Sequence, residues 1–94
     1  MSLCRVEIPP RIAEFIRHLE PQLKHRIRAA LRTLAADPAR GEPLKRDLRQ
    51  FRKYRVGRFR IVYAQEAKGR VVRIMAIGQR RRIYEELAQM VKAR

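Results

Sequence analysis

The sequence predicts a single α+β domain spanning residues 1–94, in which a small, mostly antiparallel sheet packs on an N-terminal helical hairpin. Two early segments repeat apolar residues at helical spacing. Three later segments are rich in β-branched and aromatic residues and are separated by turn signals. The expected order of elements is therefore β-α-α-β-β-β-α.

The N-terminal part is expected to form one short strand and two helices. Residues 3–8 predict a strand that Pro9 and Pro10 stop. Apolar side chains at helical spacing over residues 12–19 predict a first helix of about two to three turns. Pro21 suits the opening turn of a second helix, whose apolar stripe ends near Asp37. Two such helices joined by a few residues should pack as an antiparallel hairpin.

The second half is expected to supply the rest of the sheet. Residues 39–50 have the composition of a surface connection, and strands follow at about residues 51–56, 58–66 and 70–78. Gly57 and the pair Lys68-Gly69 mark the turns. The last of these strands is apolar on both sides, as in a central strand, and a final helix begins near Arg81. We expect the helices on one face of the sheet, which leaves the opposite face free for function.

The chain is strongly basic, with 24 Lys and Arg residues against 9 Asp and Glu and a net charge of +15. Self-repulsion at such a charge opposes folding, which indicates that the charge is kept for an anionic partner. Residues 40–94 hold seventeen of the cations and five of the acids, whereas residues 1–39 hold seven and four. We therefore expect the anion to dock on the second half.

The segment KYRVGRFRIVY, residues 53–63, is patterned as a hairpin that is half core and half cation array. Lys53 and Arg55 share one face of its first strand, while Tyr54 faces the apolar side, as Tyr63 does in the second strand. Further cations lie in the connection and after the last strand, and each one taken singly is also compatible with a solvated surface charge. The candidate phosphate-contacting cations are Lys45, Arg46, Arg49, Lys53, Arg55, Arg58, Arg60, Arg80, Arg81 and Arg82.

Tyr84 lies four residues beyond Arg80, at the expected start of the last helix. Beside convergent cations a tyrosine can stack on a base, hydrogen-bond to phosphate or give up its proton more readily. The alternative is an amphipathic residue at the edge of the core. The sequence pattern alone leaves both interpretations open.

Several classes of site are not expected from this sequence. The single cysteine, Cys4, allows no internal disulfide, and His18 and His25 lie outside any metal-spaced cluster. Neither a phosphate-binding glycine loop nor a Ser-His-Asp arrangement is present, so we expect no metal and no cofactor. The chain has no run of about 18 apolar residues, and its start does not have the pattern of a signal peptide. We therefore expect a cytoplasmic protein without membrane contact.

The chain resembles the RelE/ParE superfamily of bacterial and archaeal toxins from toxin–antitoxin systems over nearly its whole length. The resemblance is carried by the helical segment LRTLAADP, by Pro43-Leu44 before the sheet, by KYRVGRFRIVY and by IGQRRRIY. It implies a RelE-like fold with the order of elements given above. It also implies a cognate acidic antitoxin as partner, with the complex a higher-order oligomer and the toxin alone a monomer.

Within that superfamily the RelE branch consists of ribosome-dependent endoribonucleases that cut mRNA, whereas the ParE branch poisons DNA gyrase and commonly lacks the nuclease residues. The RelE pattern is matched here by Lys53, Arg55, Arg60, Arg80 and Tyr84. Arg55 stands where lysine is common, and the spacing from Arg80 to Tyr84 is shorter than in some members. The resemblance therefore implies a toxin that cleaves mRNA on the ribosome, with these five residues catalytic.

The implied reaction needs no metal ion. The 2′-hydroxyl of RNA attacks the adjacent phosphorus and leaves a 2′,3′-cyclic phosphate and a 5′-hydroxyl, which requires proton transfer and stabilisation of a phosphorane-like anion. Tyr84 or Lys53 would be the general base. Arg60 and Arg80 would clamp the phosphate, and Arg55 would neutralise developing charge. The alternatives are a ParE-like gyrase inhibitor and a basic nucleic-acid-binding module without catalytic activity.

Overall fold

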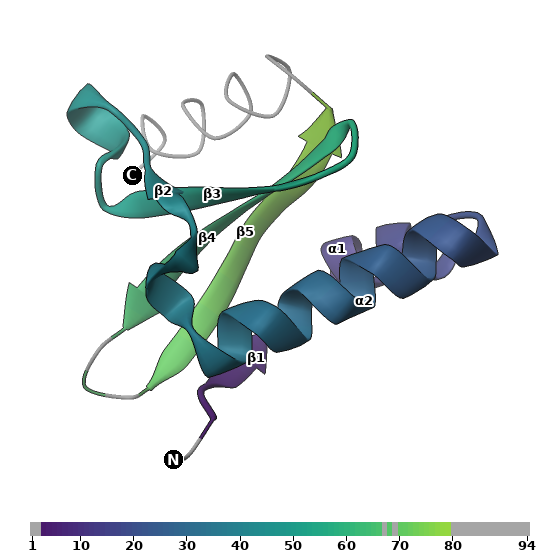
Figure 1. Ribbon diagram of the computed structural model, residues 1–94, viewed down its shortest axis with the longest axis horizontal. Helices are drawn as coiled ribbons and strands as arrows, with labels where there is room; N and C mark the ends of the chain where they lie inside the picture. The colour runs from purple at the N-terminus through teal and green to yellow at the C-terminus, as the bar shows by residue number, and fades with distance from the viewer. Residues whose placement is uncertain (1–2, 67, 69, 80–94) are drawn as a thin grey trace.

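The computed structural model describes residues 3–66, 68 and 70–79, and within them two α-helices lie beside a five-stranded sheet (Figure 1). The elements are β1 (Arg5–Glu7), α1 (Pro10–Arg17), α2 (Pro21–Ala36), β2 (Glu42–Pro43), β3 (Phe51–Val56), β4 (Phe59–Glu66) and β5 (Val71–Gln79), with short 3₁₀ turns η1 (Pro38–Arg40) and η2 (Arg46–Leu48). The predicted α+β class is confirmed, and the three later strands begin within one residue of their expected positions. The predicted final helix falls on residues outside the described ones.

The strands lie in the order β1-β5-β4-β3-β2. β1 runs parallel to β5, and every other neighbouring pair is antiparallel. β5 therefore has a neighbour on each side, as its apolar pattern predicted. The two-residue edge strand β2 was not predicted; it pairs Glu42 with Lys53 and Pro43 with Arg52.

Each helix begins at a proline, where the missing N–H leaves no intrahelical bond unmade. Pro10 opens α1, and Pro21 opens α2 as expected. The Glu20 side chain caps α2 by accepting a hydrogen bond of 2.9 Å from the backbone N–H of Leu23. The chain leaves α2 at Asp37, just before the next proline, which agrees with the predicted end.

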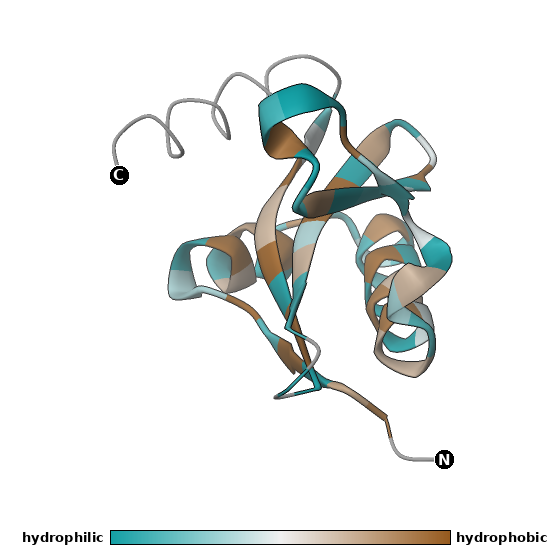
Figure 2. Ribbon diagram, turned by 90° about the vertical axis from the view of Figure 1, so that its left-hand side faces the viewer, coloured by the Kyte–Doolittle hydropathy of each residue, from teal (hydrophilic) through white to brown (hydrophobic). Residues whose placement is uncertain are grey.

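The main core lies between the helices and the face of the sheet turned toward them, which we call the inner face (Figures 1 and 2). Both helices alternate hydrophobic and hydrophilic residues along the ribbon, and their apolar sides pack on this face. The buried residues of this core are Ile12, Ile16, Ile27, Ala30, Leu31, Leu34, Val56, Ile61, Tyr63, Val72 and Ile74. Tyr54 is half-buried against them, so both tyrosines of the hairpin face the core side as expected.

The opposite face of the sheet, which we call the outer face, carries a second apolar cluster. Its buried residues are Leu44, Phe51, Val62 and Ala76, with Leu48, Ala64 and Met75 packed against them. The connection between α2 and β3 is mostly exposed, but its two leucines fold over the sheet. The outer face, which the sequence analysis left free for function, is therefore partly covered, because β4 and β5 are apolar on both sides and need cover on both.

The β3–β4 hairpin closes in a two-residue turn. Gly57 has a φ of +59°, the left-handed conformation that glycine adopts without steric cost. Val56 pairs with Phe59, so Arg58 belongs to the turn and β4 begins one residue later than predicted.

The hydroxyl of Tyr63 ties the chain after α2 to the sheet. It donates to the backbone oxygen of Pro38 at 2.6 Å and accepts from the backbone N–H of Gly41 at 2.9 Å. Arg52 adds a hydrogen bond of 2.6 Å from Nη1 to the backbone oxygen of Gly41. A Cβ at Gly41 would lie 2.5 Å from the Tyr63 Oη and 2.7 Å from the backbone oxygen of Lys53. Only glycine therefore allows this close approach.

We predict that Tyr63→Phe lowers the free energy of unfolding by about 1–3 kcal/mol, because the buried N–H of Gly41 loses its acceptor. Urea unfolding measures the change as a lower midpoint at unchanged slope. Tyr54→Phe is the matched control, because its hydroxyl makes no hydrogen bond within residues 3–66, 68 and 70–79. Equal midpoints for the two variants would contradict the assigned role.

Burial raises the pKa of Tyr63 above its ordinary value of 10.0, against the opposing effects of the Gly41 N–H and the Arg52 charge. The unfolded chain then releases this proton at lower pH than the folded chain, so stability falls as the pH rises above 10. We expect Tyr63→Phe to show a shallower alkaline loss of unfolding free energy than the unchanged protein. An identical slope between pH 9 and pH 11 would exclude Tyr63 as the source.

We predict that Gly41→Ala destabilises the fold by about 1–3 kcal/mol through overpacking against Tyr63 and the β3 backbone. Gly57→Asn is the comparison, because asparagine tolerates the left-handed conformation and the nearest atoms at that site belong to a flexible arginine. Thermal unfolding of both variants measures the difference. A melting temperature lower for Gly57→Asn than for Gly41→Ala would contradict the steric account.

Candidate nucleic-acid interface

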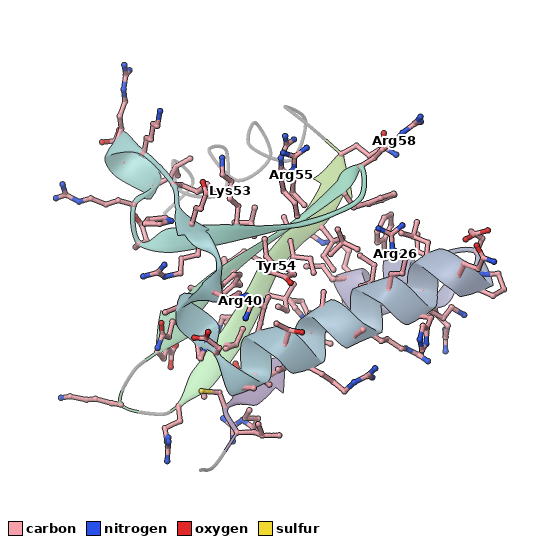
Figure 3. The ribbon with its side chains drawn as sticks, in the orientation of Figure 1. Arg26, Arg40, Lys53, Tyr54, Arg55 and Arg58 are labelled. Carbon is pink, nitrogen blue, oxygen red and sulfur yellow. The ribbon has the colours of Figure 1, made fainter. Side chains whose placement is uncertain are left out.

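Lys53, Arg55 and Arg60 meet on the outer face near the hairpin end of the sheet. The strand register sets Arg55 directly opposite Arg60 and Lys53 opposite Val62, so all three cations share that face. In Figure 3 Lys53 and Arg55 extend from β3 away from α2, whereas Tyr54 extends toward it. The alternation expected from the sequence thus agrees with the arrangement of the strands.

The described charges of the outer face differ between the two ends of the sheet. Arg73 makes ion pairs with Glu66 and, at 3.2 Å, with Glu7, whose pKa the Arg73 hydrogen bond holds below its ordinary value. Beyond the apolar cluster, Arg55 and Arg60 face each other as like charges, an arrangement that costs stability in a cross-strand pair. Such a pair is consistent with a site that receives an anion.

A surface depression of about 340 Å³ lies over these cations. The residues that line it are Arg40, Glu42, Lys53, Tyr54, Arg55 and Arg60. Arg60 is half-buried, and Arg55 is exposed. Among the described residues, the lining thus includes four cationic side chains and one carboxylate, and it offers several hydrogen-bond donors to a bound group. Arginine forks of this kind match the oxygens of a phosphate.

The sequence analysis missed three residues of this lining, Arg40, Glu42 and Tyr54. Arg40 and Glu42 belong to the chain that Tyr63 and Arg52 hold against the sheet, and β2 then sets Glu42 opposite Lys53. No local sequence pattern predicts this placement, because it depends on hydrogen bonds between residues more than ten positions apart. Tyr54 was assigned to the core, and it both packs there and lines the depression.

Other predicted contact residues are not part of the lining. Arg58 lies in the hairpin turn and extends away from Lys53 and Arg55 (Figure 3). Lys45, Arg46 and Arg49 are exposed in and beside η2. Arg26 of α2, which the sequence analysis did not single out, brings its guanidinium beside the turn, 3.3 Å from where a Cβ of Gly57 would stand. Arg80, Arg81, Arg82 and Tyr84 lie outside the described residues.

The remaining chemistry-bearing residues do not converge on the depression. His18 is exposed just after α1 and His25 is exposed on α2, and Cys4 is half-buried just before β1. In the described part of the chain, no group of three His, Cys, Asp or Glu side chains is placed to hold a metal ion. None of the described helices is long and apolar enough to cross a membrane.

Comparison with known proteins gives a family match over most of the chain. The family described as ParE toxin of type II toxin–antitoxin system, parDE, matches residues 7–84. No curated protein matches the chain.

Several solved structures share the fold. A chain of the RelBE2 toxin–antitoxin complex from Mycobacterium tuberculosis is 23% identical with a TM-score of 0.74, and the match covers 85% of this chain and 94% of that one. A mutant E. coli toxin RelE in the free state is 17% identical with a TM-score of 0.76, covering 97% and 99%. A chain of the archaeal RelE–RelB complex from Pyrococcus horikoshii is 21% identical with a TM-score of 0.69, covering 87% and 99%.

These structural likenesses show a RelE-like fold. Together with the family match over residues 7–84, they confirm the superfamily that the sequence motifs indicated. The chain belongs to the ParE toxins of type II toxin–antitoxin systems, within the RelE/ParE superfamily.

Proposed function

We propose that this toxin is a ribosome-dependent endoribonuclease that cleaves mRNA without a metal ion. The observation that carries the proposal is the depression lined by Lys53, Arg55 and Arg60, since these three residues match the RelE nuclease pattern and share one hollow. The ParE branch commonly lacks the nuclease residues, so their presence together favours cleavage over binding alone.

In this proposal the scissile phosphate occupies the depression. Arg60 would hold its non-bridging oxygens, with Arg80 as a second clamp, and Arg55 would offset the charge that develops as the 2′-hydroxyl attacks. Lys53 or Tyr84 would accept the proton of that hydroxyl. The cleaved bond leaves a 2′,3′-cyclic phosphate on one fragment and a 5′-hydroxyl on the other. Lys45, Arg46, Arg49, Arg58, Arg81 and Arg82 would contact the backbone of the RNA farther from the cut.

The proposed partners follow from charge and from the structural relatives. Several of the relatives are complexes of RelE toxins with RelB antitoxins. An acidic antitoxin of this chain would cover the cationic end of the outer face, because its carboxylates complement a protein of net charge +15. The toxin would act in the cytoplasm, as a monomer when free and within a larger assembly when bound to its antitoxin.

The second candidate function is inhibition of DNA gyrase. The match to the ParE toxin family favours it, because that branch acts on gyrase.

One experiment distinguishes the two functions. Purified toxin is added to a translating extract, where the mRNA ends are mapped, and to a gyrase supercoiling assay. Cuts at fixed codon positions support the nuclease, inhibited supercoiling without cuts supports the gyrase inhibitor, and salt-sensitive binding alone supports a nucleic-acid-binding module.

We predict that Arg60→Ala lowers the rate of mRNA cleavage by about 100-fold or more, because one charged donor to the transition state is lost. Lys53→Ala and Tyr84→Phe are expected to lower the rate as well, with the larger loss at the general base. Primer extension on ribosome-bound mRNA measures the rates.

Arg28→Ala is the matched control, because it removes one exposed arginine from α2, away from the depression. It should leave the cleavage rate within about twofold of the unchanged protein, as a surface charge with no contact to the phosphate. Circular dichroism of every variant separates lost catalysis from lost folding. Full cleavage by both Arg60→Ala and Tyr84→Phe would remove the basis for the assigned site.

A further inference from the structure

Among the described residues that line the depression, Glu42 is the one that carries a carboxylate. The β2–β3 register sets it directly opposite Lys53, and directly opposite residues of an antiparallel pair point to the same face. Its side chain nevertheless makes no ion pair or hydrogen bond within residues 3–66, 68 and 70–79. By contrast, Glu7, Glu14 and Glu66 form ion pairs, and Glu20 caps α2.

A carboxylate at this position disfavours a phosphate, because like charges in a shared hollow repel each other. Four cations would bind a phosphodiester more tightly without it. An ionised carboxylate only accepts hydrogen bonds, so its favourable partner is a donor on the ligand. In RNA the donors that point away from the backbone are on the edges of the bases.

The bases differ in what they offer to an acceptor-only group. Guanine presents an N1–H and an N2 amino group side by side, which match the two oxygens of one carboxylate. Cytosine and adenine each present a single amino group. Uracil presents one N3–H between two carbonyl oxygens, which repel a carboxylate.

We propose that Glu42 determines which nucleotide occupies the depression, by accepting hydrogen bonds from the Watson–Crick edge of a base. Guanosine is favoured, and uridine is disfavoured. This inference rests on the proposed function in taking single-stranded RNA as the ligand, but it concerns binding and does not require cleavage. Glu42 thereby lowers the general affinity for RNA and raises the discrimination between bases.

The test measures binding of the full chain to two fluorescent RNA hexamers by anisotropy. One is hexauridylate, and the other carries a single guanosine at its third position. A bidentate contact to a base typically distinguishes it by about tenfold or more. We expect the unchanged protein to prefer the guanosine-containing hexamer by about that factor. Glu42→Gln and Glu42→Ala should reduce the preference to less than about twofold and bind hexauridylate more tightly than the unchanged protein does.

Asp47→Asn is the matched control, because it also removes one exposed acid but lies outside the depression. It should tighten binding of both hexamers by a similar factor and keep the preference for guanosine. The inference is overturned if the unchanged protein binds the two hexamers equally or binds neither, or if Glu42→Ala keeps the original ratio. Glu42 is exposed, so its variants are expected to fold, and their thermal unfolding checks this.

Failure of this inference is distinguishable from failure of the proposed nuclease function. If the unchanged protein cuts mRNA at fixed codon positions but Glu42→Ala keeps the full preference for the guanosine-containing hexamer, the nuclease function stands and the base contact is excluded. If the preference for the guanosine-containing hexamer depends on Glu42 but no mRNA is cut, the base contact stands and the nuclease function is excluded.

Discussion

The hydroxyl of Tyr63 makes the interaction on which the arrangement of this protein depends. It is a polar group on a fully buried side chain, and it meets its hydrogen-bonding requirement with a carbonyl and an N–H of the segment that leaves α2. That segment starts at the helical layer and must reach the edge of the sheet. Because Tyr63 and Arg52 hold it in place, β2 can pair with β3 and the two leucines that follow can cover the outer face.

The outer face then divides into three parts with different electrostatics. At one end, ion pairs of Arg73 join β5 to β1 and β4. The middle is occupied by the apolar cluster under the connection between α2 and β3. At the hairpin end, cationic side chains line the depression. The opposed pair Arg55 and Arg60 is unfavourable for folding by itself. An anion bound between the two guanidinium groups would offset that repulsion.

The chain belongs to the ParE toxin family and has the fold of RelE toxins. A common scaffold does not choose between the nuclease and the gyrase inhibitor, because function depends on the site carried by the fold. Here the site combines three residues of the RelE pattern with Arg40, Glu42 and Tyr54, which that pattern does not include. The carboxylate of Glu42 distinguishes this hollow from a uniform basic patch.

The sequence by itself determined the two described helices, the strands other than β2 and the face of each hairpin residue. Local periodicity sufficed for α2, β3 and the placing of Lys53 and Arg55, because side-chain direction in a helix or strand follows from neighbouring residues. Only the tertiary structure decided that Leu44 and Leu48 cover the outer face, and that Arg40 and Glu42 reach the depression. Those placements depend on contacts between residues distant in the chain, above all the bonds of Tyr63 to Pro38 and Gly41, which no local pattern encodes.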